Sequence, residues 1–349
     1  MGKAHWKPDA TEERLDSGPL ADQAGGEYFA IKLQTLGEDT LVDFNLWLKQ
    51  GQRVVLYREH DLPFNLEVID RLRAHNVKEL LVSWADREKF CRYVESNLSN
   101  ILDDRSVAEN EKAATIGLAA ANLAQDLIAA PDEAKVVRAR ELCLLMSTYG
   151  RDNMRSLAGV VRLNANSGKI SAHCVNMAIY SLALAGQLGV GSLSDLADFT
   201  LSAYVADLGK QYVPPEILEN SEPLDQHGLA LVRRHPVQTV EMIGGFLERD
   251  SKVAEAILAH HERVDGSGYP RARSGTEIGT MAQVAGIADV FDGLTADRPD
   301  RPRRKPYEAL QIMTSEMQTG FEDRILKAFV RCLGKLPVVM VRDSTSNHP

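Results

Sequence analysis

Apolar residues repeat in two different ways along the chain, and the change divides it into two parts. Between residues 27 and 103, the short apolar runs YFAIKL, RVVLY and ELLVSW are typical of strands. The stretch FNLEVIDRLRAHNV has apolar residues at helical spacing. This mixture predicts a small α/β domain. Residues 1–26 lack apolar periodicity, and we expect them to form a flexible leader.

The rest of the chain has the pattern of helices. Residues 104–134 include an alanine-rich run that ends at Pro131, which favours a connecting helix. Helical spacing continues from 135 to 335 and is interrupted at LGVGS, KQYVPPE and GSGYP. Residues 336–349 are assigned to a C-terminal tail. The predicted fold class is therefore α+β overall, with a small α/β domain followed by an all-α helical bundle.

Composition and charge narrow the classes of partner. The 349 residues are 44% hydrophobic and 26% charged, as expected for a globular protein with two domains. A net charge of -9 argues against DNA or RNA as a partner, although a local basic cluster could hold a small anion. The chain shows neither a membrane span nor a signal peptide, so we expect a cytoplasmic protein. Its four cysteines form no CxxC pair, which argues against a thiolate zinc site.

The segment HHERVDGSGYP at 260–270 carries the strongest chemical signal. Its two adjacent histidines follow a helical run, and near a helix end the backbone can direct both rings toward one point. Further candidate ligands lie in other predicted helices: His173 in ISAHCVN, Asp207 in YVADLGK, His235 in RRHPVQ and Asp289 in GIADVFDG. Imidazoles and carboxylates without thiolates suit iron, manganese or zinc.

Together, these motifs between about Ser171 and Tyr307 resemble the HD-GYP family of metal-dependent phosphohydrolases. The resemblance implies an HD-type helical bundle that hydrolyses the bacterial second messenger cyclic di-GMP by metal-activated water. It implies one or two divalent ions held by His173, Asp207, His235, His260, His261 and Asp289. It assigns catalytic roles to Asp207 and Lys210. The GYP signature is Gly268, Tyr269 and Pro270, and Arg298 and Arg301 fall where the family places basic residues against the ligand phosphate.

Two of these assignments have alternatives. Lys210 follows Asp207 by three residues, so its ammonium could hold a phosphate oxygen on the same helical face. It could instead be a cation at a helix C-terminus after Gly209. Arg298 and Arg301 belong to the densest positive run of an acidic chain, which is explained either by an anionic ligand or by a solvated loop.

The chain departs from the family pattern at the position that gives the family the first half of its name. Ala206 stands where the His-Asp doublet has histidine, so the group of His173, Asp207 and Asp289 lacks one ligand. We expect weaker metal binding there. Lys169 precedes His173 by four residues. Its ammonium could partly replace the missing cation and leave a mononuclear centre, or it could be solvated on the helix surface.

The sequence therefore supports more than one function. The first is a cyclic di-GMP phosphodiesterase with weakened activity. The second is a catalytically degenerate module that binds cyclic di-GMP, or a protein partner through its GYP surface, and signals without hydrolysis. A nucleotide phosphatase is a third reading, against which the GYP loop argues. The connecting helix could carry a homodimer interface or could pack on its own domain.

Overall fold

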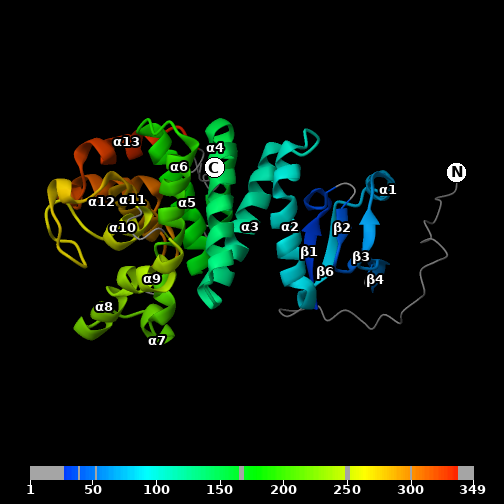
Figure 1. Cartoon of the computed structure of the whole chain (residues 1–349), viewed down its shortest axis with the longest axis horizontal. Helices are drawn as coiled ribbons and strands as arrows, with labels where there is room; N and C mark the ends of the chain where they lie inside the picture. The colour runs from blue at the N-terminus through cyan, green and yellow to red at the C-terminus, as the bar shows by residue number, and fades with distance from the viewer. Residues whose placement is uncertain are drawn as a thin grey trace, which may run out of the picture. The chain divides into compact units, whose positions relative to one another are not determined.

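A computed structural model describes residues 27–37, 40–51, 53–164, 169–247, 252–298 and 301–336. The chain divides into two compact units, Met1–Thr115 and Ile116–Pro349. Each unit is described by itself, and Figure 1 labels most of the helices and strands of both. The predicted leader at 1–26 lies outside the described residues, as does the tail from residue 337 onward.

The first unit contains an antiparallel sheet with the strand order β1-β6-β3-β4. A separate antiparallel pair joins β2 to β5. The strands are β1 (Tyr28–Lys32), β2 (Thr40–Val42), β3 (Leu46–Gln50), β4 (Arg53–Arg58), β5 (Leu62–Phe64) and β6 (Glu79–Ser83). Two helices, α1 (Leu66–Ala74) and α2 (Arg87–Asp103), complete the unit.

Side-chain periodicity explains these elements. In β6, Leu80 and Val82 are fully buried and alternate with more exposed neighbours, which is the period of a strand with one buried face. Helix α1 begins where the Asn65 side chain accepts a hydrogen bond from the Val68 backbone N–H at 3.1 Å. Helix α2 buries Phe90, whose ring lies edge-on to Phe44 of the same core. The prediction of strands and helices mixed in one small unit is confirmed.

The second unit is a bundle of helices in the described residues. They are α4 (Glu133–Asn164), α5 (Ile170–Gln187), α6 (Leu193–Val205), α7 (Pro215–Leu218), α8 (Gln226–Val232), α9 (His235–Ile243), α10 (Lys252–Ala259), α11 (Thr280–Thr295), α12 (Pro306–Ser315) and α13 (Asp323–Leu333). Helix α3 (Glu109–Ala129) occupies most of the predicted connecting segment and crosses the division between the units. The α+β fold class is confirmed.

Helix α5 lies at the centre of the bundle. It is buried around most of its circumference and packs against α4, α6, α11 and α13 (Figure 1). Tyr180 of α5, Phe291 of α11 and Phe329 of α13 form a cluster of edge-on rings with centroids 5.1–6.1 Å apart. This packing holds α5 and α11, which carry His173 and Asp289, in a fixed relation. Among the described helices, none is both long and apolar enough to span a membrane.

Candidate metal centre

Six candidate ligands from five segments of the bundle meet in one place. His173 lies in α5, Asp207 follows the end of α6, His235 begins α9, His260 and His261 follow α10, and Asp289 lies in α11. Asp207 belongs to two groups, one with His235, His260 and His261, the other with His173 and Asp289. Within each group, the ligand atoms lie within 4.8 Å of one another. These are the six residues that the family resemblance implied as metal ligands, and in the structure they lie in two adjacent groups that share Asp207.

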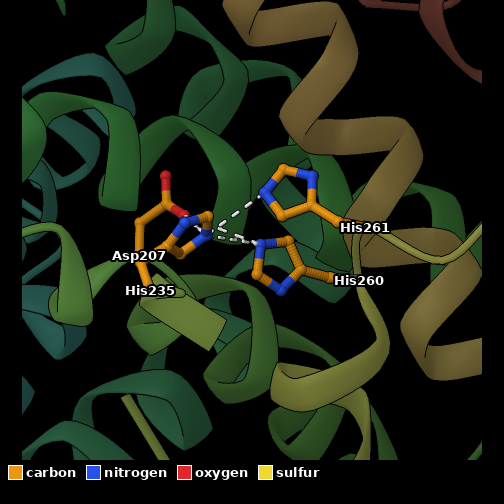
Figure 2. Close-up of side chains that lie close together, drawn as sticks. All are labelled: Asp207, His235, His260 and His261. Atoms are coloured by element: carbon orange, nitrogen blue, oxygen red, sulfur yellow. Dashed lines mark hydrogen bonds and ion pairs between the residues drawn. The ribbon is translucent and has the colours of Figure 1, made fainter. Parts of the chain in front are cut away.

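In the four-residue group, side chains converge on the Nε2 atom of His235 (Figure 2). This nitrogen lies 3.0 Å from Asp207 Oδ1, 3.3 Å from His260 Nε2 and 3.2 Å from His261 Nε2. His235, His260 and Asp207 are fully buried. The arrangement is that of three imidazoles and one carboxylate around a common point.

Backbone carbonyls determine which nitrogens face that point. Nδ1 of His235 lies 2.7 Å from the Val232 carbonyl, and Nδ1 of His260 lies 2.6 Å from the Ile257 carbonyl. Because a carbonyl only accepts, each Nδ1 carries the hydrogen, and in the neutral rings each Nε2 presents a lone pair. Asp207 Oδ1 is buried without a hydrogen-bond partner among the described residues. Lone pairs facing one another without a donor fit a bound cation.

The second group lies on the other oxygen of the shared carboxylate. His173 Nε2 is 2.8 Å from Asp207 Oδ2 and 3.3 Å from Asp289 Oδ1, yet it has no aligned hydrogen bond in the described structure. Lys210 also forms an ion pair with Asp207 Oδ2. This second group therefore offers fewer ligands, and one of its oxygens already contacts an ammonium.

The electrostatics keep the carboxylates charged. Burial raises the pKa of Asp207, but the charge of Lys210 and the close approach of the His173 and His235 rings outweigh it and hold that pKa well below its usual range. Burial also opposes the charge of Asp289, whereas His261, His173 and Lys210 hold its pKa well below normal. Burial lowers the pKa of His261 well below its usual value, which favours the neutral ring. These are the protonation states that metal ligands need.

His173 has the opposite electrostatic environment. Burial lowers its pKa, but the neighbouring carboxylates of Asp207, Asp289 and Asp292 raise it well above the usual value. Without a metal, these carboxylates therefore favour the protonated ring. A divalent cation in the second group has to displace a proton from this ring, which weakens its binding further.

A threonine and a glycine place Asp207 beside His235. The Thr239 hydroxyl donates to the Ala206 carbonyl at 2.9 Å and accepts from the Gly209 N–H at 2.8 Å. A Cβ atom at Gly209 would lie 2.2 Å from the His235 carbonyl oxygen. Glycine therefore lets the turn after Asp207 approach α9 closely enough for the two ligands to meet.

The GYP loop supports the histidine pair. Both carboxylate oxygens of the buried Glu262 accept backbone hydrogen bonds, from Arg271 N at 2.7 Å and from Arg273 N at 2.9 Å. The Tyr269 ring stacks on His261 with centroids 4.6 Å apart and planes 19° from parallel. A Cβ atom at Gly268 would lie 2.4 Å from the Arg263 backbone nitrogen. Sequence reasoning missed Glu262, a buried acid directly after the ligand histidines.

A cavity of about 300 Å³ opens beside the second ligand group. Cationic side chains that line it are Lys169, Lys210 and Arg298, next to His173 and Asp292. Lys169 is exposed, and in the described structure the ion pair with Asp207 comes from Lys210, not from Lys169. Lys169 therefore lines the cavity, but the described structure shows no ion pair between it and the candidate ligands. Its role as a substitute for the missing cation stays a prediction.

Two groups of predicted ligand-binding residues lie elsewhere. The Arg301 guanidinium donates to the carbonyls of Gly293 and Leu294 near the end of α11, and Arg301 does not line the cavity. Tyr269 and Pro270 line a separate surface groove, whose other lining residues are Gln226, Leu229, Ala230, Arg233 and Arg234. The structure therefore brings Arg298 to the cavity and leaves Arg301 and the GYP loop outside its lining.

Ala206 is part of an apolar cluster beneath the second group. It is fully buried with Met177, Ala203 and Ala285. Met177 follows His173 by one helical turn, and Ala285 precedes Asp289 by one turn. Where the family resemblance leads us to expect histidine, the structure has packed aliphatic side chains.

Comparison with known proteins agrees with this geometry. The sequence profile of the HD domain matches residues 161–325. Over 185 residues, the chain is 32% identical to the cyclic di-GMP phosphodiesterase PA4108 of Pseudomonas aeruginosa, which covers 52% of this chain and 44% of the relative. Residues 161–325 are an HD domain of the HD-GYP family. Over 257 residues, this chain is also 29% identical to the cyclic di-GMP phosphodiesterase response regulator RpfG of Xanthomonas campestris, which covers 73% of this chain and 63% of that protein.

Other relatives of this HD-GYP domain differ in their named substrate. The 3'3'-cGAMP-specific phosphodiesterase 3 of Vibrio cholerae is 33% identical over 50% of this chain and 38% of its own. The chain thus spans less than two thirds of the length of these three curated relatives. Among solved structures, Bd1817, an HDG"Y"P protein from Bdellovibrio bacteriovorus, superposes with a TM-score of 0.62 at 20% identity, over 88% of this chain and 99% of that one. That likeness shows a shared fold.

Proposed function

We propose that this HD-GYP domain is a metal-dependent phosphodiesterase that hydrolyses a cyclic dinucleotide, with cyclic di-GMP as the first substrate. The observation that carries the proposal is the convergence of three imidazoles and Asp207. Lys210, which pairs with Asp207, also lines the neighbouring cavity together with Arg298. Hydrolysis adds one water across one P–O bond of the ring and opens it to a linear dinucleotide. Both the ligand cluster and the two cations Lys210 and Arg298 at the cavity suit that reaction.

The principal ion is assigned to the group of Asp207, His235, His260 and His261. It has four ligands, of which Asp207, His235 and His260 are fully buried, and Asp207 Oδ1 has no hydrogen-bond partner among the described residues. Nitrogen and oxygen ligands without sulfur favour iron, manganese or zinc. A divalent cation there would polarise a phosphoryl oxygen and lower the pKa of a coordinated water.

The remaining side chains bind and orient the nucleotide. Lys210 lies between Asp207 and the cavity, where its ammonium can donate to a phosphate oxygen as negative charge develops. Arg298 contributes a second positive charge at the cavity lining. Relatives are named for either cyclic di-GMP or cGAMP, which share a guanine nucleotide, so we propose cyclic di-GMP first and cGAMP as the alternative substrate.

A second function, binding without hydrolysis, is favoured by a specific observation. Ala206 supplies no ligand, and Asp207 Oδ2 is already paired with Lys210, so the second group is poorly equipped for a second ion. If turnover depends on two ions, the domain would bind the nucleotide, or a partner at the GYP surface, and signal without cleaving it. The homodimer, the protein partner and the cytoplasmic location stay predictions.

The deciding experiment combines metal content with turnover. The purified 349-residue chain is analysed for bound metal and incubated with cyclic di-GMP or cGAMP and manganese or ferrous iron under reducing conditions. Formation of linear dinucleotide or nucleoside monophosphate, abolished by His260→Ala and kept by the matched change of the exposed His227→Ala, supports the enzyme. Nucleotide binding without any cleavage supports the sensor. A chain that binds neither metal nor nucleotide contradicts both proposals.

A further inference from the structure

Asp292 lies behind the second ligand group, and sequence reasoning gave it no role. It follows Asp289 by one turn of α11 and is buried, with 3% of its surface exposed. Its Oδ2 atom lies 2.6 Å from His173 Nδ1. His173 therefore contacts Asp292 through one ring nitrogen and faces Asp207 and Asp289 through the other.

The carboxylate of Asp292 is itself held in place. Its Oδ1 atom accepts a hydrogen bond from Asn176 Nδ2 at 2.8 Å. The Oδ1 atom of Asn176 accepts in turn from Asn164 Nδ2 at 3.0 Å, at the end of α4. Asn176 is buried and lies one turn after His173 on α5. Three helices thus orient a single carboxylate toward the outer nitrogen of one imidazole.

This chain of hydrogen bonds determines what His173 can offer a metal. An ionised carboxylate only accepts, so His173 Nδ1 must carry a hydrogen when it bonds to Asp292. In the neutral ring, the lone pair is then on Nε2, the atom that points at Asp207 and Asp289 and lacks an aligned hydrogen bond. The His235 and His260 rings are oriented by backbone carbonyls, whereas His173 depends on a side chain.

We infer that Asp292 is a positioning residue that orients His173 and selects its Nδ1–H tautomer, and that it thereby sustains metal binding in the three-ligand group alone. The inference rests on the proposed function for its assumption that His173 is a ligand. Because Ala206 leaves this group without a fourth protein ligand, a misoriented His173 has no neighbour to compensate for it. The four-ligand group does not contain His173 and is not expected to depend on Asp292.

Asp292→Asn provides the test, because it keeps the shape and removes the obligate acceptor. The 349-residue chain is titrated with manganese by calorimetry, and its metal content is measured by elemental analysis. We expect the tight site to stay filled while affinity at the weak site falls about 10–100-fold. Asp297→Asn is the matched control, since Asp297 lies on the same cavity lining but accepts from the Arg303 backbone N–H.

A second variant and a second readout guard against loss of folding. Asn176→Ala leaves Asp292 in place without its donor, and we expect a smaller fall at the weak site only. In the zinc-loaded protein with ¹⁵N-labelled histidine, the wild type should show the His173 Nδ1–H resonance coupled to a metal-bound Nε2, and Asp292→Asn should lose it. A purely structural ion pair would lower stability without this selective change.

The outcomes separate this inference from the function on which it rests. Equal weak-site affinity in the wild type and in Asp292→Asn overturns the positioning role, as does an equal fall at both sites. A wild-type chain that takes up one ion but no second ion at millimolar manganese also overturns it, while the principal site stands. If the chain binds no metal, the proposed metal-dependent phosphodiesterase activity is itself contradicted.

Discussion

Replacing Ala206 by histidine tests whether the missing ligand at this position limits metal binding in the second ligand group. Ala206 is fully buried against Met177, Ala203 and Ala285. The first and last of these lie one helical turn from His173 and Asp289. An imidazole at position 206 therefore points into packed aliphatic atoms before it can reach a metal. We expect the substitution to lower the stability of the metal-free protein, and we expect bound metal to restore part of that stability.

The magnitude follows from packing and polarity. Overpacking a well-packed core costs about 1–3 kcal/mol. A buried imidazole without a hydrogen-bond partner costs about 1–3 kcal/mol more. Since about 1 kcal/mol lowers the Tm of a unit of this size by about 2–4 °C, the metal-free variant should melt roughly 5–20 °C below the wild type. Manganese at about 100 times its Kd would return about 2.7 kcal/mol.

The assay is thermal unfolding with and without manganese, together with metal content per chain. Ala206→Leu is the matched control, because it adds comparable bulk without a lone pair. Both variants should lose stability without metal, and only Ala206→His should regain it with manganese and bind more metal than the wild type. A metal-free Ala206→His protein as stable as the wild type would refute the packing argument. Equal metal uptake by the two variants would show that position 206 does not face the site.

Three further predictions concern the phosphate contact, the GYP loop and pH. Lys210→Met should weaken cyclic dinucleotide binding about 10–100-fold in equilibrium titrations, since a charge-assisted hydrogen bond contributes about 1.5–3 kcal/mol; unchanged affinity would contradict the phosphate role. Gly268→Ala places a Cβ atom 2.4 Å from a backbone nitrogen and should lower the Tm by about 2–12 °C, whereas Gly191→Ala, with nothing within 4 Å, should not. The free energy of unfolding without metal, measured by denaturant titration, should peak near pH 6.5. Above that pH the folded state retains the His173 proton that the unfolded chain loses, because its folded pKa is raised. Below that pH the unfolded chain binds a proton at His261, whereas the folded state does not, because the folded pKa of His261 is lowered. Stability that rises steadily from pH 5 to 8 would contradict these shifts.

The amino-acid sequence by itself determined the architecture and the chemistry of the ligands. Period-two and helical spacing predicted a small mixed domain before a helical bundle, and both are present. The paired histidines in HHERVDGSGYP and the scattered His and Asp motifs identified the HD-GYP family and a candidate ligand set. These features are local, because propensity, periodicity and residue type are properties of short segments.

Tertiary structure decided which partners each side chain meets. His173 and Asp292 are 119 positions apart in the chain, and no local pattern says that they share a hydrogen bond. Arg301 looked like a phosphate ligand, but its guanidinium meets carbonyls at the end of α11. The sequence shows only that Ala206 cannot be a metal ligand, whereas the fold shows that its side chain packs in a buried aliphatic cluster. Such outcomes depend on how helices pack at ångström scale, where one buried hydrogen bond or Cβ atom selects the arrangement.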